Sequence, residues 1–538
     1  MARKRKVYVL YLAGYTMAAR RLVTPLGLLI VATSIKASGR FGSDDRVFIC
    51  DTLGEVRRRV RAHKRDDVCF LVSSVQVLRG VTPETNTAIQ ACRSIRSLCP
   101  KVFCIVGGPD VALNPRAYDS EFDLVFEGEV GTTDLVAVIE SGVRRYSAGF
   151  ADLSAEQVDY SLLGKKKYLC ASLQMARGCP YRCSFCNVVS IYGEKTRVMS
   201  DGGMYERLQS LARYHQGFVI ISDDNFGGIP RRAEELLDVM IRFQEANGYP
   251  FKFVAQATMN MSKKPALMEK FRRAGLVAAF IGVESPSKDV LKSVRKRHNT
   301  TRPLAEQVRV FIDHGIVPLL SFILGLDEEE DDVTDQTKAL LEACGTPLIG
   351  LNLFNPVVGS QLYRDFEAAG RLLNHPTYSE HWLIPAKTLR DYEAIVDDYA
   401  DITHWFFDSR RLLGYVARVN AAINENRSPA LESTGDQKIS WWLLLRTTLI
   451  YLLLCLRSGT WQGVPFLFRL DRSSRTRFLY SLAVTTVALG LKTDYLKATK
   501  RLRAGLAQLR HHRLYPFEAR PDQPGPPQEL AAAGRPGA

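Results

Sequence analysis

The sequence predicts an α/β fold in three parts: a doubly wound parallel sheet over residues 1–145, a partial (β/α)6 barrel of the TIM type over 165–360, and a helical region over 361–512. Short apolar runs alternate with helical stretches in the first part, and six longer strand–helix units follow in the second. The third part is mostly helical. Residues 146–164 are predicted to form a linker. Residues 513–538, rich in Pro, Gly and Ala, are predicted to be a disordered tail.

Five apolar runs in the first part are predicted to be buried strands. Their spacing leaves room for a crossover helix between most of them, which is typical of a parallel sheet with helices on both faces. Small or turn-forming residues end three of the runs: Ser73-Ser74, Gly107-Gly108-Pro109 and Glu127-Gly128-Glu129. Ligands of open α/β sheets bind at such carboxyl ends. The predicted strands are Val7–Tyr11, Val47–Cys50, Val68–Ser73, Val102–Val106 and Leu124–Phe126.

Six further strands are predicted in the second part, with helices between them such as Arg231–Glu245 and Pro265–Ala274. In barrels of this type the active site lies at the carboxyl ends of the strands. The residues that follow each strand are therefore the candidate site. The predicted strands are Tyr168–Ala176, Gly217–Ser222, Phe251–Ala257, Val277–Glu284, Val317–Leu324 and Leu348–Phe354.

The helical third part contains two apolar stretches, Trp441–Leu456 and Phe478–Leu491. The first is broken by Arg446 and is shorter than the ~20 residues that a membrane-spanning helix needs. A buried or interfacial helix is favoured over a spanning one. Trp441-Trp442 with basic flanks fits contact with a membrane surface. The alternative to membrane contact is a helical cap packed on the barrel, and this alternative is favoured.

The formal net charge of +15 favours contact with anionic surfaces or ligands. Basic residues gather at 3–6 and at 497–513, but no zinc-finger spacing or basic–aromatic stripe accompanies them, so no nucleic-acid partner is expected. The N-terminus is charged, and no long apolar run with a cleavage site follows it. The sequence therefore predicts a cytoplasmic protein, either free or peripheral to the membrane.

The eleven cysteines, an odd number spread over a long chain, do not fit a disulfide framework. Reduced thiols in a cytoplasm fit better. Seven of them lie mostly in apolar or helical contexts and are predicted to be buried structural thiols: Cys50, Cys69, Cys92, Cys99, Cys104, Cys344 and Cys455.

Three other cysteines, Cys179, Cys183 and Cys186, lie on one short loop after the first predicted barrel strand. With three and two intervening residues, they can wrap one face of a 4Fe–4S cluster, whose usual ligands are thiolates. A fourth cysteine is absent at this spacing, which leaves one iron open for a substrate or cofactor. A zinc site is disfavoured because structural zinc takes four ligands and no partner cysteine pair has zinc-like spacing.

At this loop the chain resembles the radical SAM superfamily, over about residues 165–360. The resemblance implies a 4Fe–4S cluster whose open iron chelates the amino and carboxylate groups of S-adenosylmethionine (SAM). Electron transfer from the reduced cluster then gives methionine and a 5′-deoxyadenosyl radical. Six segments match in the right order, from the cysteine loop to Asn355–Tyr363. The resemblance implies these SAM-contacting residues: Phe185, Asp223, Asp224, Gln256, Glu284, Ser285 and Ser321.

Asp223 and Asp224 depart from the family pattern. The family has a common Gly-Gly-Glu at the end of the second strand, where it contacts the SAM amino group. This chain has Ser222-Asp223-Asp224-Asn225-Phe226 there. The family position predicts a SAM contact, and the acidic replacement leaves the individual role of each carboxylate open.

The first part resembles the cobalamin-binding domain, flavodoxin-like in fold, that precedes the barrel in one large radical SAM subgroup. A flat corrin ring must lie across the strand ends, where bulky side chains would block it. The implied cobalamin-binding residues are Tyr15, Thr24, Leu26, Gly27, Ser73, Ser74, Val75, Gly107, Gly108, Pro109, Glu127, Gly128 and Glu129.

One departure concerns the lower ligand of the cobalt. Many cobalamin proteins carry a cobalt-binding histidine in the first strand–helix loop. The matching loop here, Ala13–Met17, has none. The only histidine of this part, His63, is predicted to be exposed in a charged helical stretch. Cobalamin is therefore expected to bind without protein histidine ligation, and the cofactor itself carries the chemistry.

The combined resemblance implies a cobalamin-dependent radical SAM methyltransferase that methylates an unactivated carbon of a small substrate. The Trp441-Trp442 pair and its basic flanks, which fit contact with a membrane surface, mildly favour a lipophilic substrate such as a polycyclic isoprenoid. A cyclase or rearrangement enzyme uses the same motifs and is the alternative; a cobalamin sensor with a degenerate barrel is disfavoured by the intact cysteines. Flavodoxin or ferredoxin is the expected electron donor. No catalytic acid or base is assigned. Five residues either line the substrate pocket or are ordinary aromatics: Tyr363, His375, Tyr378, His381 and Trp382.

Overall fold

A computed structural model describes residues 4–14, 21–74, 86–227, 230–299, 302–373, 383–426, 428–432, 441–457, 460, 463–467 and 475–511. The chain forms two compact units. The first contains Met1–Pro180, Cys186–Phe243 and Val357–Gly359, and the second contains Tyr181–Phe185, Gln244–Pro356 and Ser360–Ala538. The first unit therefore holds the predicted N-terminal domain together with the first strands of the predicted barrel. The domain boundaries at 145 and 165 stay predictions.

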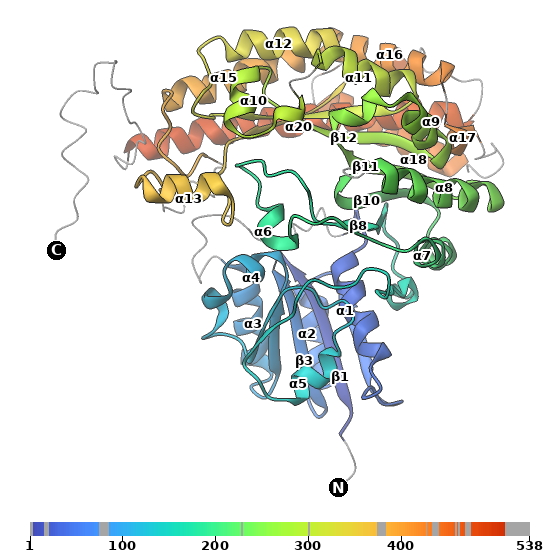
Figure 1. Cartoon of the computed structure of the whole chain (residues 1–538), viewed down its shortest axis with the longest axis vertical. Coiled ribbons are helices and arrows are strands. Elements are labelled where there is room, and N and C mark those ends of the chain that lie inside the picture. The colour runs from blue at the N-terminus through green and yellow to red at the C-terminus, as the bar shows by residue number, and fades with distance from the viewer. Residues whose placement is uncertain are drawn as a thin grey trace. The chain divides into compact units, whose positions relative to one another are not determined.

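The N-terminal sheet has six strands in the order β2-β1-β3-β4-β5-β6, and every pairing in it is parallel. Helices α2 and α3 pack beside each other, as do α1 and α5, so two helical layers accompany the sheet (Figure 1). The doubly wound prediction is confirmed, with β6 as a strand that the sequence did not indicate. The strands are β1 Lys6–Ala13, β2 Arg46–Cys50, β3 Asp67–Ser74, β4 Phe103–Gly107, β5 Leu124–Glu127 and β6 Arg145–Ser147; the helices are α1 Leu26–Ala37, α2 Leu53–Ala62, α3 Thr87–Leu98, α4 Pro109–Leu113 and α5 Leu135–Glu140.

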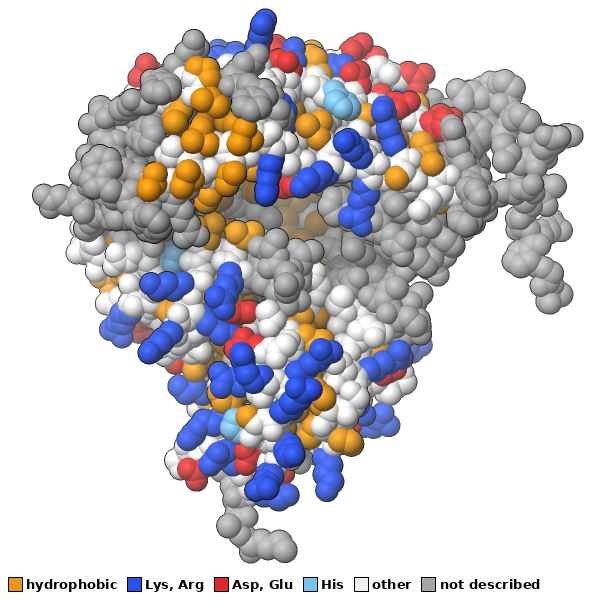
Figure 2. All heavy atoms as spheres, turned by 180° about the vertical axis from the view of Figure 1, so that it is seen from behind, with side chains coloured by type: hydrophobic (Ala, Val, Ile, Leu, Met, Phe, Trp, Pro, Cys, Tyr) orange, Lys and Arg blue, Asp and Glu red, His pale blue; other side chains and the backbone are white. Residues whose placement is uncertain are grey.

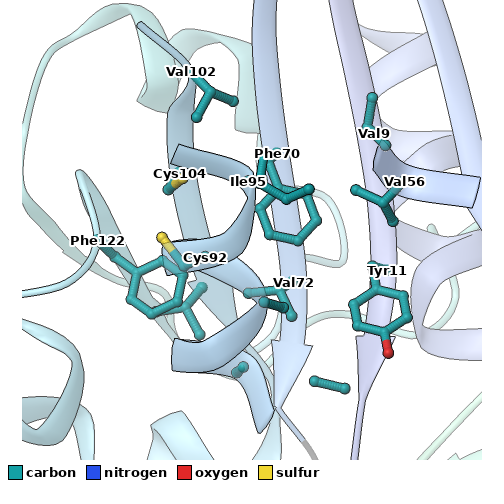
Figure 3. Packing of buried hydrophobic residues seen from close by; sticks show 14 of the residues in the cluster. Val9, Tyr11, Val56, Phe70, Val72, Cys92, Ile95, Val102, Cys104 and Phe122 are labelled. Atoms are coloured by element: carbon teal, nitrogen blue, oxygen red, sulfur yellow. The ribbon is translucent and has the colours of Figure 1, made fainter. Parts of the chain in front are cut away.

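Alternate side chains of β1 and β3 fill the core under α2 and α3. Val9, Phe70 and Val72 lie within it and pack with Ile95 from α3 (Figure 3). Burial of each such side chain contributes about 1.5–3 kcal/mol. Because these residues fix the strands in register, the carboxyl ends of β3, β4 and β5 meet at one edge of the sheet.

A second set of parallel strands follows in chain order. In the first unit β7 pairs with β10, and in the second unit β11, β12, β13 and β14 pair in sequence order. The strands are β7 Ala171–Leu173, β8 Ala176–Arg177, β9 Arg197–Val198, β10 Gly217–Phe226, β11 Phe251–Ala257, β12 Leu276–Glu284, β13 Val317–Leu324 and β14 Leu348–Leu353; the helices are α6 Val188–Tyr192, α7 Asp201–Tyr214, α8 Pro230–Ala246, α9 Pro265–Ala274, α10 Lys288–Ser293, α11 Leu304–Asp313 and α12 Val333–Cys344.

The predicted strand Tyr168–Ala176 is wrong in one respect, because the chain breaks it into β7 and β8. Asp223 Oδ1 accepts the backbone N–H of Met175 at 2.7 Å, and this side chain takes the place of a strand partner. The next two residues then pair antiparallel with β9 instead. The cysteine loop therefore follows β8 rather than a long first barrel strand.

The remaining helices belong to the second unit, and α18 and α15 both pack against α20. Within the described residues, no helix is both long and apolar enough to cross a membrane. His375, Tyr378, His381, Trp382 and the predicted tail lie outside the described residues. The seven predicted structural thiols are buried, as expected. The helices are α13 Gln361–Ala368, α15 Tyr392–Phe406, α16 Ser409–Glu425, α17 Pro429–Glu432, α18 Trp441–Arg457, α19 Gly463–Phe466 and α20 Arg475–His511.

Candidate functional site

A cavity of about 570 Å³ lies in the first unit, at the carboxyl ends of β3, β4 and β5. This size is within the ~300–1,000 Å³ range of ligand pockets. Its lining also includes Ser172, Gln174, Arg177 and Ser222, from the segments that follow the N-terminal sheet. Nine residues predicted to bind cobalamin line it: Thr24, Leu26, Gly27, Ser73, Gly107, Gly108, Pro109, Gly128 and Glu129.

Glycines keep this cavity open and shape its rim. A Cβ at Gly27 would meet no atom within 4 Å, so it would project into empty space. Gly108 has φ +106°, and a Cβ there would lie 2.7 Å from both Ser73 Oγ and the Ser74 carbonyl. Only glycine fits such a position without strain or collision. The ends of β3 and β4 therefore carry no bulky side chain at these positions.

Two further predicted cobalamin residues, Ser74 and Glu127, are not among the residues that line the cavity. Ser74 is buried and donates its hydroxyl to Asp110 at 3.1 Å, while Glu127 pairs with Arg145 at 3.5 Å. Tyr15 and Val75 lie outside the described residues. Sequence order alone could not separate side chains that face the cavity from those that face the interior.

His63 was expected to be exposed, and this expectation is wrong. It follows α2 as its C-terminal cap, is partly buried, and holds its Nδ1 2.9 Å from Asp66 Oδ2. Its ring also lies 5.5 Å from that of Phe48. It is not among the residues that line the cavity.

A buried network of charges connects the cavity with the start of the cysteine loop. Arg177 donates to Glu129 at 2.8 Å and to Glu156 at 2.7 Å. Arg197 also pairs with Glu129, at 2.5 Å, and Arg207 donates to the Glu156 backbone carbonyl at 2.6 Å. Burial opposes ionisation of Glu129, but hydrogen bonds and charges from Arg197 and Arg177 outweigh it and hold its pKa below the usual value. Both carboxylates are paired, which is what buried charges require.

The sequence analysis missed most of this network. Only Glu129 of this network was a predicted site residue; Arg177 lies two residues before Cys179, and Glu156, Arg197 and Arg207 are far apart in the sequence. Only the fold gathers them, and no local pattern distinguishes them from ordinary surface charges.

The acidic residues at the end of β10 bind the backbone that leads into the cysteine loop. Asp223 accepts from Met175, and Asp224 Oδ2 accepts the N–H of Gly178 at 3.1 Å. Asn225 Nδ2 lies 3.7 Å from Cys179 Sγ. Burial raises the pKa of Asp223 to about 7 and that of Asp224 to about 6. A SAM contact for these carboxylates stays a prediction.

In the second unit, the middle of the cysteine loop is held by backbone and ring contacts. The N–H of Ser184 donates to the Val294 carbonyl at 3.0 Å, and the Ser184 carbonyl accepts from Leu362 at 2.8 Å. Tyr181 stacks on His298 with ring centroids 4.1 Å apart. These contacts fix the residues on both sides of Cys183.

Glu284, predicted to contact SAM, forms a buried ion pair at the end of β12. Its Oε1 accepts from Lys296 Nζ at 2.5 Å, and its backbone has φ 69°, which is uncommon for a non-glycine residue. The Lys296 ammonium lies 5.8 Å from the centre of the Phe185 ring. A Cβ at Gly282 would lie only 2.2 Å from Glu284 Oε1. The second unit thus brings predicted SAM residues Phe185 and Glu284 around one lysine that the sequence analysis did not single out.

The other predicted SAM residues of the second unit are spread over its strand ends. Gln256 is exposed on β11. Ser285 is buried and accepts the Ser287 N–H at 3.2 Å, and Ser321 Oγ accepts from Asn352 at 3.3 Å. Their contact with SAM stays a prediction.

Cys179, Cys183 and Cys186 are each partly buried on the loop between β8 and α6. Within the described chain, no three His, Cys, Asp or Glu side chains converge as ligands of one metal ion. A 4Fe–4S cluster does not need such convergence, because each thiolate binds a different iron. Three partly buried thiols on one short loop are therefore a donor set that fits a cluster with one open iron.

Comparison with known proteins supports this assignment. Residues 173–341 match the model of the Radical SAM superfamily. The chain is 28% identical over 363 residues to the hopanoid C-2 methylase of Rhodopseudomonas palustris, and the match covers 65% of this chain and 65% of that protein, just under two thirds of its length.

Two solved structures have a similar fold. The methyltransferase TsrM from Kitasatospora setae, with cobalamin and a [4Fe–4S] cluster bound, matches with TM-score 0.55 and 14% identity over 69% of this chain and 76% of TsrM. The radical enzyme OxsB, with aqua-cobalamin and SAM bound, matches with TM-score 0.55 and 14% identity over 94% of this chain and 84% of OxsB. At such low identity the likeness concerns the fold. Together with the three-cysteine loop, the comparisons show that residues 173–341 match the Radical SAM superfamily and that the fold of the chain is similar to those of TsrM and OxsB, two radical enzymes solved with cobalamin bound.

Proposed function

We propose that this protein is a radical SAM C-methyltransferase that methylates an unactivated carbon of a small, lipophilic substrate. The observation that carries the proposal is the cavity lined by nine predicted cobalamin residues on a chain that also carries the three-cysteine loop. When bound, the cluster supplies reductive cleavage of SAM, and the cobalamin supplies a transferable methyl group.

The protein's own residues have distinct roles in this proposal. Cys179, Cys183 and Cys186 hold the cluster and leave one iron open for SAM. Asp223 and Asp224 fix the backbone before Cys179 through accepted N–H groups. This rigidity matters because radical transfer depends on the position of the reacting groups.

Two features of the second unit suit SAM. The Glu284 carboxylate, already oriented by Lys296, can accept hydrogen bonds from the ribose hydroxyls. Phe185 lies on the loop beside the last cysteine and offers its backbone to the adenine. Both roles follow from the resemblance, and the ion pair supports the first of them.

The cavity also bears on how cobalamin is held. Among the described residues that line it, none is a histidine. This supports the proposal of a cobalamin without histidine ligation. A weak or absent lower ligand would change how readily the cobalt–carbon bond releases its methyl group.

The substrate class is proposed from the relatives. The hopanoid C-2 methylase is named for a polycyclic lipid, and it shares 28% identity with this chain. A lipophilic polycyclic isoprenoid is therefore the proposed substrate class. Flavodoxin or ferredoxin is the proposed electron donor.

The test is anaerobic reconstitution of the full chain with iron, sulfide, cobalamin and SAM, followed by reduction with dithionite and incubation with a polycyclic isoprenoid. We expect 5′-deoxyadenosine, S-adenosylhomocysteine and a product heavier by one CH₂, with two SAM molecules consumed per turnover. Deoxyadenosine with a product of unchanged carbon number would favour the cyclase or rearrangement alternative. A protein that binds cobalamin but never cleaves SAM would favour the sensor.

A further inference from the structure

Helix α18 carries a stripe of exposed apolar side chains. Leu445, Leu449, Ile450, Leu453 and Leu456 are each between 42% and 53% exposed. Leu445, Leu449, Leu453 and Leu456 are spaced by three or four residues, which places them along one side of the helix, and Ile450 adjoins Leu449 at the flank of that side. Tyr451 and Cys455 are fully buried and face the other way. We call these five side chains the α18 stripe.

The exposed hydrophobic side chains of the described residues are concentrated on α18. The described residues include eleven exposed large hydrophobic side chains, and five of them belong to the stripe. On the face drawn in Figure 2, hydrophobic side chains gather at the upper left, where α18 lies when the view of Figure 1 is turned round. Single exposed apolar residues are ordinary, but a contiguous patch marks an interaction site.

The geometry of α18 excludes a transmembrane role and fits an interfacial one. Its 17 residues, at about 1.5 Å each, are shorter than the ~30 Å hydrocarbon core. It also packs against α20 along its buried side. A helix held in this way can only lie along a membrane, with its free face toward the lipid.

The charge of these two helices points to the partner. The sequences of α18 and α20 together contain ten Lys or Arg and one acidic residue, Asp494. Arg457 ends α18, and Lys492 of α20 reaches Thr460 near that end at 2.9 Å. The exposed basic residues of the next turns of α20 are Lys497, Lys500, Arg501 and Arg503.

This charge separates two possible occupants of the stripe. A second copy of the chain would bring the same basic side chains against it, and like charges repel. An anionic lipid surface provides the opposite charge, together with an apolar layer for the leucines. Basic residues beside an apolar helix face are the pattern of peripheral membrane binding.

We propose that the α18 stripe docks the protein on the surface of a bilayer that contains anionic lipids. The leucines enter the boundary between headgroups and acyl chains, and the basic residues of α18 and α20 contact the lipid headgroups. The proposal does not depend on the methylation reaction, so it stands or fails on binding alone.

The test uses the full chain and extruded vesicles of phosphatidylcholine with or without 30 mol% phosphatidylglycerol. We expect cosedimentation with the anionic vesicles at low salt, and binding that is at least tenfold weaker to neutral vesicles. A doubled variant, Leu449→Gln with Leu453→Gln, should lose at least tenfold in binding. Lys497→Gln with Lys500→Gln should weaken binding and reduce its dependence on salt.

The matched control is Leu169→Gln with Val143→Gln, which changes two exposed apolar side chains of the first unit and should leave binding unchanged. Thermal melting checks that each variant folds. Equal binding of the stripe variant and this control would overturn the proposal, and so would equal binding to neutral and anionic vesicles. A dimer in analytical ultracentrifugation that Leu449→Gln with Leu453→Gln dissociates would assign the stripe to self-association instead.

Discussion

The strand ends of the N-terminal sheet differ in kind from those of β10 and β12. The former are small and mostly uncharged at Ser73, Gly107 and Gly108, and they open a cavity of about 570 Å³. The latter carry Asp223, Asp224 and Glu284, each engaged by a backbone amide or a lysine. Parallel sheets place ligands at the same edge in both cases. On the proposed function, the large flat cofactor would bind where side chains are absent, whereas the small charged one would bind where side chains are already held in place.

The largest effect is expected from loss of a cluster thiolate, which should abolish the reaction proposed for the polar strand ends. In Cys183→Ala, we expect iron and sulfide to fall well below the wild-type content and 5′-deoxyadenosine formation to drop below detection, because two thiolates cannot hold a cluster with one open iron. Iron analysis and SAM cleavage measure this. Cobalamin binding should persist, since the cavity is built elsewhere. Cys170→Ala is the control, and an equal loss there would contradict the assignment.

Asp223 gives the polar strand ends a pH dependence that the small ones lack. Its pKa is about 7 in the folded protein against an ordinary 3.8. Between these values the folded state binds more protons than the unfolded state, so stability falls as the pH rises from about 4 to 7. Asp223→Asn should remove this slope, which amounts to at most about 4 kcal/mol. Thermal melts of both proteins from pH 5 to pH 8 test it. Parallel curves for the two proteins would refute it.

Filling the small strand ends should damage only the cavity. In Gly108→Ala, the added Cβ collides with Ser73 Oγ and the Ser74 carbonyl. Overpacking of this kind costs about 1–3 kcal/mol of folding stability, and the residues of the cavity wall must shift to relieve it. We expect weaker cobalamin binding in a spectroscopic titration, with unchanged iron content. Gly142→Ala is the control, because Gly142 also has a positive φ, of +72°, but a Cβ there would meet no atom within 4 Å.

The smallest expected effect concerns Glu284. Glu284→Gln removes the charge that Lys296 balances and weakens any hydrogen bond to a ribose by about 1.5 kcal/mol. We expect the KM for SAM to rise about tenfold while the Kd for cobalamin is unchanged. Glu330→Gln, an exposed residue of the same unit, is the control. An unchanged KM would remove Glu284 from the SAM site.

The strands were predictable from the sequence because buried parallel strands are continuous apolar runs. Phe251–Ala257 and Val317–Leu324 match β11 and β13 residue for residue. The break between β7 and β8 was not predictable, since it depends on a side chain of β10 that lies nearly fifty residues away.

Some residues of the candidate site were likewise predictable from the sequence, and others were not. Glycines and cysteines at strand ends can be recognised in the sequence, because few other residues can replace them. Which serines face the cavity, and which arginines meet Glu129 and Glu156, depends on the packing of distant segments. Ser74 and Ser73 are neighbours in the sequence, yet only Ser73 lines the cavity.

The Arg177–Glu129 pair has a consequence for how the enzyme is assembled. Glu129 lines the cavity, while Arg177 stands two residues before Cys179. A ligand that orders Glu129 would also restrain the chain at the first thiolate. Linkage requires that this influence be mutual and of equal size in both directions. Cobalamin would then raise the affinity for iron and sulfide by the same factor as the inorganic centre raises the affinity for cobalamin.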